Sequence, residues 1–218
     1  MKTEYYRRLP HLHYVGAVFF ITFNLRGAIP AEVVARLAGE KQVALLALKR
    51  SGGDTEELYK EHKRHFARID HILDTLQYGP DWLKNPSVAE SVKNKLHQYD
   101  TANYELLAHC IMANHVHIVV DTAVQLDGLT TNDTITSANY TQLHVTLKHI
   151  KGGSARVANQ LLDRTGAFWQ PESYDHYVRN SAELQRIINY TLQNPVKAGL
   201  VETWEEWPHT YLSPAYRT

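Results

Sequence analysis

The sequence of 218 residues lacks the features that mark secreted, membrane-spanning or disordered proteins. Cys110 is its one cysteine, so no internal disulfide can form and a reducing compartment fits best. No apolar run approaches the roughly 20 residues that span a bilayer. Residues 1–10 are charged and aromatic, unlike a signal peptide. We therefore expect a cytoplasmic globular protein that makes no use of a membrane.

A net charge is also missing. The chain has 23 basic and 23 acidic side chains, so its overall charge does not point to nucleic acid. Residues 141–200 nevertheless hold seven basic and four acidic side chains, and residues 1–27 are also mildly basic. Solvated helix faces explain such stretches, and binding to phosphates is the alternative.

Apolar spacing predicts the secondary structure. Residues 17–25 are rich in aromatic and β-branched side chains and predict a strand. Residues 103–112 and 115–120 predict a β-hairpin that turns at Ala113-Asn114. Apolar residues recur at helical spacing in five segments, which are residues 30–51, 54–76, 87–99, 141–163 and 181–194.

The order of these elements predicts the fold. One strand, several helices, a hairpin and further helices are typical of an α+β protein. We expect an antiparallel sheet with helices packed on one face, in a single domain over residues 1–218. Residues 121–140 are polar and predict an exposed loop, and Gly152-Gly153 predicts a kink or a split in the helix of residues 141–163.

Two histidines stand close together in the second strand of the predicted hairpin. Side chains alternate along a strand, so His115 and His117 are expected on one face and Val116 on the other. Two neutral imidazoles make half of a typical set of metal ligands. Chance is the alternative, because the chain contains 13 histidines.

A tyrosine and an asparagine form a second pair near the end of the last predicted helix. Tyr190 and Asn194 are four residues apart and therefore share one helix face. Asn194 precedes Pro195, so we expect it at the helix end, where its side-chain oxygen can turn outward. A packed aromatic residue followed by a helix cap is the alternative interpretation.

Three ordered motifs resemble those of one known family. Residues 112–120 (MANHVHIVV) resemble its HUH motif, in which a hydrophobic residue separates two histidines. Residues 168–180 contain FWQ, YDH and RN and resemble a second signature, and residues 190–201 (YTLQNPVKAGLV) resemble a third. With the opening YYRR of residues 5–8, nearly the whole chain resembles the REP-associated tyrosine transposases, a branch of the single-tyrosine HUH transposases. It departs from their pattern at Ala113, where relatives usually have proline, and in the long 121–140 segment.

This resemblance implies a ferredoxin-like HUH nuclease fold and an enzyme that cuts single-stranded DNA beside a hairpin. It implies that Tyr190 is the nucleophile and that His115, His117 and Asn194 hold Mg²⁺ or Mn²⁺. The implied product is a 5′-phosphotyrosine with a free 3′-hydroxyl, which a second 3′-hydroxyl can reverse without ATP. The implied partner is single-stranded DNA with a hairpin from a REP-like palindrome, bound by a monomer or a homodimer.

The same resemblance suggests how DNA would be held. We expect phosphate contacts from the basic side chains of the two basic stretches, namely Arg7, Arg8, Lys148, Lys151, Arg179 and Lys197. The aromatic residues Tyr5, Tyr6, Phe168 and Trp169 either stack on unpaired bases or pack in the core. Asp175 and His176 belong to the second signature, and we expect them to have a structural role near the site.

Three other functions compete with this interpretation. A relative that has lost cleavage and only binds hairpins would be expected to lack one of Tyr190, His115, His117 and Asn194. An unrelated metallohydrolase would need a further carboxylate or histidine ligand, and the sequence contains no HExxH motif. A replication-initiator HUH nuclease has similar chemistry, but the NPVKAG sequence of residues 194–199 favours the transposase branch.

Overall fold

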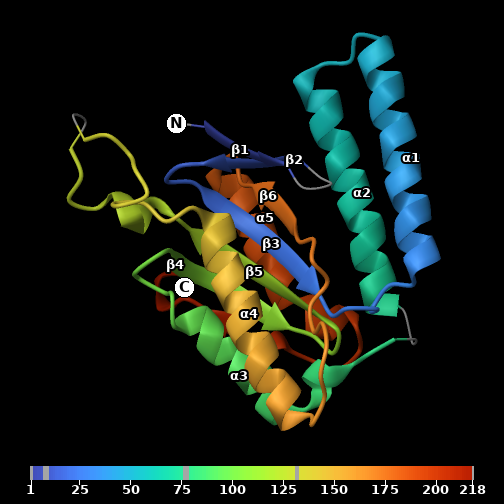
Figure 1. The fold of residues 1–218 in the computed structure, drawn as a ribbon, viewed down its shortest axis with the longest axis vertical. Coiled ribbons are helices and arrows are strands. Elements are labelled where there is room, and N and C mark those ends of the chain that lie inside the picture. Colours follow the sequence, from blue (N-terminus) through green and yellow to red (C-terminus); the bar gives the residue numbers. More distant parts are fainter. Residues whose placement is uncertain (1, 7–9, 76–78, 131–132, 218) are drawn as a thin grey trace.

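The computed structural model describes residues 2–6, 10–75, 79–130 and 133–217. Its centre is a five-stranded antiparallel sheet (Figure 1). In spatial order the strands are β6 (Tyr174–Tyr177), β3 (Val18–Asn24), β5 (His115–Asp121), β4 (Glu105–Ile111) and β7 (Thr210–Leu212). A separate antiparallel pair is formed by β1 (Lys2–Tyr6) and β2 (Pro10–Tyr14).

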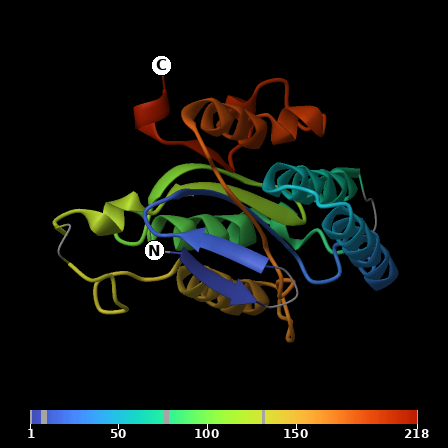
Figure 2. The same ribbon diagram turned by 90° about the horizontal axis from the view of Figure 1, so that it is seen from above.

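Helices cover both faces of the sheet, whereas the sequence predicted one covered face. On one face lie α3 (Pro86–His97) and α4 (Leu143–Leu161), and on the other lies α5 (Ser181–Leu192), followed by α6 (Asn194–Lys197) (Figure 2). The physical reason is that β5 is buried on both sides, so each side needs a covering layer. Short 3-10 helices occupy Trp82–Lys84, Ala123–Leu126, Trp204–Glu206 and Pro214–Tyr216.

The arrangement is the ferredoxin-like one. The succession β3-α3-β4-β5-α4-β6, with spatial order β6-β3-β5-β4, is a split β-α-β motif repeated twice in an antiparallel sheet. The predicted α+β class with an antiparallel sheet is therefore confirmed. Two long helices, α1 (Ala31–Arg50) and α2 (Thr55–Thr75), are inserted between β3 and α3 and stand beside the sheet (Figure 1).

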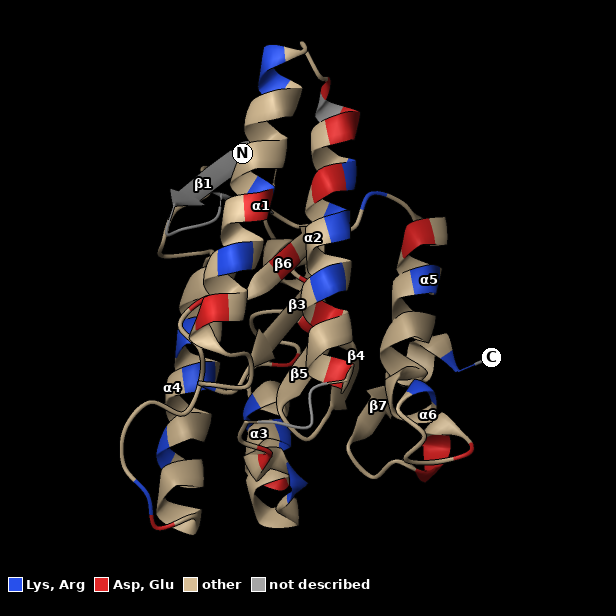
Figure 3. Cartoon of the chain, turned by 90° about the vertical axis from the view of Figure 1, so that its right-hand side faces the viewer, with Lys and Arg blue, Asp and Glu red and all other residues tan. Residues whose placement is uncertain are grey.

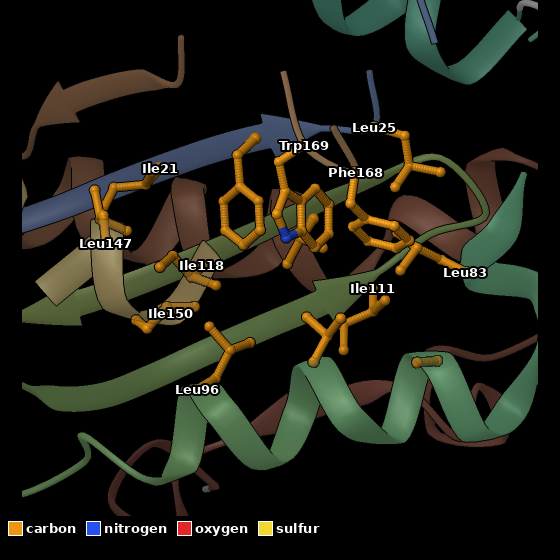
Figure 4. Packing of buried hydrophobic residues seen from close by; sticks show 14 of the residues in the cluster. Ile21, Leu25, Leu83, Leu96, Ile111, Ile118, Leu147, Ile150, Phe168 and Trp169 are labelled. Atoms are coloured by element: carbon orange, nitrogen blue, oxygen red, sulfur yellow. The ribbon is translucent and has the colours of Figure 1, made fainter. Parts of the chain in front are cut away.

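The main core lies between the sheet and the α3–α4 layer. Alternate residues of β5, Val116 and Ile118, are fully buried there with Ile21 of β3. Leu96 of α3 and Ile150 of α4 close this layer from outside (Figure 4). Since side chains alternate, the intervening β5 residues His115 and His117 must face the opposite layer.

The glycine pair in α4 does not break the helix, so the predicted split is wrong. The helix runs without interruption from Leu143 to Leu161. A Cβ atom on Gly153 would lie 2.9 Å from Lys95 Cε, so the Lys95 side chain of α3 lies over the space that a larger residue would fill. A glycine inside a helix can thus serve packing rather than flexibility.

The last predicted helix ends earlier than expected. Helix α5 stops at Leu192, and Asn194 opens the new short helix α6, with Pro195 in its first turn. Proline has no N–H to donate to the preceding turn but is well tolerated at the start of a helix. The break therefore turns the chain at the motif that carries Asn194 and Lys197.

The remaining segments follow the prediction unevenly. The 121–140 segment contains the 3-10 helix Ala123–Leu126 and buries Thr122 and Tyr140, so it is less exposed than predicted. Strands β1, β2, β6 and β7 were not predicted; β6 lies in what was expected to be a connector. Among the described helices, none combines the length and apolarity required to cross a bilayer.

Candidate metal and nucleophile site

The two imidazoles of the HUH motif meet on the α5 face of the sheet. His115 and His117 are 1% and 0% exposed, and their Nε2 atoms are 3.0 Å apart. Strand alternation predicted this shared face. Burial lowers the pKa of His115 to about 3 and that of His117 well below its ordinary value, so both rings are neutral near pH 7.

The outer nitrogens of both rings are held by neighbouring polar side chains. His115 Nδ1 donates to Asn114 Oδ1 at 2.6 Å, and the Asn114 amide donates in turn to the Leu73 carbonyl at 3.0 Å. His117 Nδ1 lies 2.6 Å from Thr22 Oγ1 on the neighbouring strand β3. Such contacts fix the ring orientations and turn the Nε2 atoms inward, as in many metal sites.

Two carboxylates of α2 approach these nitrogens. Asp70 Oδ1 lies 3.4 Å from His117 Nε2, and Asp74 Oδ1 lies 3.6 Å from His115 Nε2. Ligand atoms of Asp70, His115 and His117 all lie within 4.8 Å of one another, and the three residues are buried. Together they form a group that could hold a divalent cation.

The acidic pair is held in unfavourable surroundings. Burial raises the pKa of Asp70 to about 8, and the negative charge of Asp74 adds to this effect. Burial also raises the pKa of Asp74, to about 6. Asp70 Oδ1 is buried and has no hydrogen-bond donor among the described residues. A cation between this oxygen and the imidazoles would remove that penalty.

Sequence reasoning missed Asp70 and Asp74. Both lie in the predicted 54–76 helix at a spacing of four residues, and Asp70 lies four residues after Phe66, one of the apolar residues that recur at helical spacing in this segment. A carboxylate on the apolar face of a helix was the available signal. Which strand that face would meet depends on contacts between distant parts of the chain, so the pairing with the histidines was not predictable.

Tyr190 lies against this centre. Its ring centroid is 5.7 Å from that of His117 and 5.9 Å from that of Phe20, both edge-on. Lys197 Nζ lies 4.3 Å from the centroid of the Tyr190 ring. The structure thus brings Tyr190, predicted as the nucleophile, beside one of the two predicted histidine ligands.

Asn194 is buried one helical turn beyond Tyr190, with 1% of its surface exposed. Its Nδ2 donates to the Tyr190 carbonyl at 3.5 Å, a long and weak bond. Its Oδ1 is buried without a donor among the described residues. Asn194 and Asp70 therefore each present an unsatisfied oxygen, which fits the donor chemistry of a divalent cation.

His176 belongs to a different polar cluster, centred on the buried Glu183. One Glu183 oxygen accepts from Tyr59 Oη at 2.5 Å and from Lys63 Nζ at 3.1 Å, both on α2. The other oxygen accepts from the Arg179 backbone N–H at 3.0 Å, and His176 Nε2 lies 3.3 Å from the first oxygen. This cluster connects the start of α5 to α2 and gives His176 a structural place near the site.

The other predicted DNA contacts are dispersed. Lys148 and Lys151 lie on α4, across the sheet from the histidines, along a groove of about 580 Å³. Lys151 Nζ donates to the Gln170 carbonyl at 2.8 Å, and Arg179 pairs with Glu56 at 2.8 Å. Arg7 and Arg8, like the side chains of Tyr5 and Tyr6, lie outside the described residues.

The aromatic residues of the second signature are part of the core. Phe168 and Trp169 are 1% and 6% exposed, and Trp169 Nε1 donates to Ser154 Oγ at 3.0 Å. Of the two interpretations of this pair, packing in the core is the one the structure supports. Neither ring presents a free face for a base.

The fold and the site together define a class of protein: a ferredoxin-like α+β chain with a buried His-His-Asp group and a tyrosine beside it. None of the protein-family models matches the chain. One curated relative is a protein of Haemophilus influenzae named "Putative REP-associated tyrosine transposase". It is 29% identical over 107 residues, which are 49% of this chain and 58% of the relative. The chain thus matches little more than half the length of that relative.

The resemblance to the REP-associated tyrosine transposases, first indicated by the motifs, is confirmed by this homologue. A solved structure titled "Structure of the REP associates tyrosine transposase bound to a REP hairpin" also matches. It covers 95% of this chain and 82% of its own, with 16% identity and a TM-score of 0.48.

Proposed function

We propose that this protein is a metal-dependent single-stranded DNA endonuclease and strand transferase, which cuts beside a hairpin through Tyr190. The observation that carries this proposal is the contact of the Tyr190 ring with His117, at 5.7 Å between centroids. It puts a phenol next to a group of two imidazoles and a carboxylate that can hold a cation. Homology to a transposase supports the same class of reaction.

The residues suited to hold a divalent cation are His115, His117 and Asp70. Asn194, four residues after Tyr190, offers a further buried oxygen that lacks a hydrogen-bond donor among the described residues. Asp70 adds a carboxylate to a ligand set that the family resemblance made entirely neutral. Oxygen donors favour Mg²⁺ or Mn²⁺, whereas the imidazoles alone would favour softer ions. When bound, such a cation supplies Lewis-acid polarisation of a phosphoryl oxygen.

The chain's own side chains would carry out the remaining steps. The Tyr190 phenol loses its proton, and its oxygen attacks the phosphorus of the scissile linkage. The bond to the 3′ oxygen breaks, and that oxygen takes up a proton to become a free 3′-hydroxyl. The phosphate remains on Tyr190 as a 5′-phosphotyrosine, so a second 3′-hydroxyl can reverse the step and rejoin strands. Helix α5, packed on the sheet, keeps the tyrosine against the histidines.

A covalent adduct is the direct test. The protein is incubated with single-stranded oligonucleotides from the DNA that flanks its gene, each able to form a hairpin, with Mn²⁺ or Mg²⁺. We expect a protein–DNA adduct that resists denaturation and depends on the cation. Tyr190→Phe removes one oxygen and should abolish the adduct while hairpin affinity stays near that of the wild type.

Tyr177→Phe is the matched control, because Tyr177 lies in β6 on the other face of the sheet, against Phe19. This variant should form the adduct at the wild-type rate. An adduct that persists in Tyr190→Phe would refute the assignment of the nucleophile. Hairpin binding without any adduct in the wild type would instead identify a catalytically inactive DNA-binding relative.

A further inference from the structure

Lys197 lies where the nucleophile and the candidate metal ligands meet. It is the last residue of α6, and its backbone N–H donates to the Gln193 carbonyl at 2.9 Å, across the junction of α5 and α6. Its Nζ lies over the Tyr190 ring, 4.3 Å from the centroid. The break at Pro195 thus turns the end of this motif back onto the tyrosine of the preceding helix.

The charge of Lys197 acts on the whole centre. Burial raises the pKa values of Asp70 and Asp74, and the positive charge of Lys197 acts to lower them. The same charge also lowers the pKa of His117, in the same direction as burial does. The residue is exposed, and no carboxylate of the described residues forms an ion pair with it. Its ammonium group therefore lies over the Tyr190 ring, acts electrostatically on Asp70 and Asp74, and is open to a ligand from outside.

Two other basic side chains near α5, Lys63 and Arg179, form ion pairs with glutamates. Lys63 Nζ lies 3.1 Å from Glu183 Oε1, and Arg179 Nη1 lies 2.8 Å from Glu56 Oε2. Both belong to the cluster at the start of α5, whereas Lys197 belongs to α6, which follows the opposite end of α5 (Figure 3). A phosphodiester that comes within reach of the Tyr190 oxygen would meet the ammonium group of Lys197.

We propose that Lys197 binds the phosphate that Tyr190 attacks and is a catalytic residue for the transfer of that phosphate. This inference rests on the proposed function. In the step, a bond forms from the Tyr190 oxygen to phosphorus and the bond from phosphorus to the 3′ oxygen breaks. The phenol releases its proton to water, and the 3′ oxygen takes one from water. Lys197 stays protonated and offsets the negative charge that gathers on the non-bridging oxygens.

A binding experiment tests this contact without any cleavage. All proteins carry Tyr190→Phe, and Lys197→Met is compared with Lys197 in that background. The probes are hairpin oligonucleotides in which one methylphosphonate, which lacks the phosphate charge, is moved along the strand beside the hairpin. We expect Lys197→Met to weaken binding to the unmodified strand about tenfold. At one position the methylphosphonate should remove this difference.

A kinetic experiment then asks whether that phosphate is the one that reacts. At saturating oligonucleotide, Lys197→Met in the otherwise wild-type protein should slow adduct formation on the order of 10²-fold. Lys197→Arg, which keeps the charge, should recover much of the rate. Lys93→Met is the matched control, because Lys93 lies on α3 across the sheet and pairs with Glu90. It should change neither measurement.

The two arms separate failure of this inference from failure of the proposed function. If no methylphosphonate position couples to Lys197, or if the coupled phosphate is not the one cleaved, the inference is wrong. An unchanged adduct rate in Lys197→Met would also overturn it. A wild-type protein that forms no adduct, yet shows coupling at one phosphate, would refute the nuclease proposal and leave Lys197 as a phosphate-binding residue only.

Discussion

The carboxyl group of Asp70 is the most unusual single group in the candidate site. It is 4% exposed, it lies 3.4 Å from the neutral His117, and Asp74 lies one helical turn away. A buried carboxylate without a cation or a donor costs several kcal/mol when ionised. The folded chain tolerates this cost at a place where two imidazoles are also buried, which is typical of a metal site.

The pH dependence of stability follows from this burial. The pKa of Asp70 rises from 3.8 in the unfolded chain to about 8 in the folded one, so the folded form retains a proton that the unfolded form loses. In the presence of a chelator, the free energy of unfolding should therefore fall as the pH rises from about 4 to about 8. Asp70→Asn should remove most of this dependence and make the metal-free protein more stable at pH 8, as measured by urea unfolding.

With a divalent cation bound, the carboxylate of Asp70 should stabilise the wild-type protein, whereas Asp70→Asn should gain less from the cation. Mn²⁺ at 100 times its dissociation constant should raise the wild-type free energy of unfolding by about 2.7 kcal/mol at pH 7.5. Asp70→Asn should weaken Mn²⁺ binding by at least about tenfold, as measured by calorimetry. Asp127→Asn, at an exposed position after a 3-10 helix, is the control. Equal Mn²⁺ affinity in all three proteins would exclude Asp70 as a ligand.

At the scale of elements, two helices position the side chains of the site. Helix α2 carries Asp70 and Asp74, α5 carries Tyr190, and the Glu183 cluster connects the two helices (Figure 3). Burial acts to raise the pKa of Glu183, but hydrogen bonds from Tyr59, the Arg179 backbone and Lys63 outweigh it and lower the pKa to about 2. The cluster is therefore an ionised and well-satisfied connection.

Replacing Glu183 should loosen this connection. Both Glu183 oxygens accept hydrogen bonds, so in Glu183→Gln the amide N–H group must point at a donor, which is either the Arg179 N–H or the Tyr59 and Lys63 side chains. We expect this conflict to lower the free energy of unfolding by about 1–3 kcal/mol. Because the folded pKa is depressed, the loss should be full above pH 4.5 and should shrink as the pH falls toward 2. Urea unfolding at pH 3 and pH 7 checks this, with the exposed Glu205→Gln as control. A loss that is the same at both pH values would contradict it.

Local pattern explains why some elements were predictable and others were not. The strands with His115 and Ile21 and the long helices carry their own periodicity, so their bounds agree with the prediction within a few residues. Strand β6 spans four residues, Tyr174–Tyr177, and becomes a strand by pairing with β3. That His115 and His117 lie on one face of the sheet follows from the alternation of side chains along a strand. The position of Asp70 beside His117 depends on how the inserted helix α2 packs, which the local sequence does not determine.

For the whole molecule, the sheet separates two places where DNA was expected to bind. The histidines, Tyr190 and Lys197 lie on the α5 side, whereas Lys148 and Lys151 lie on α4, across the sheet (Figure 2). Balanced overall charge gives no long-range attraction for DNA, so binding must depend on such local groups. A strand that touches both sides has to pass around an edge of the sheet.

The salt dependence of binding can show whether DNA takes that path. Lys148 is exposed on α4 beside the groove that its neighbour Lys151 also lines. If Lys148 meets a phosphate, Lys148→Ala should weaken hairpin binding and reduce the slope of log affinity against log salt by about one unit. Lys93→Ala, on the neighbouring helix α3 and paired with Glu90, should leave the slope unchanged. Fluorescence anisotropy in Tyr190→Phe, between low and moderate salt, measures both slopes without cleavage. Equal slopes for Lys148→Ala and the parent would confine the DNA to the α5 side, where Lys197 and the candidate metal ligands lie.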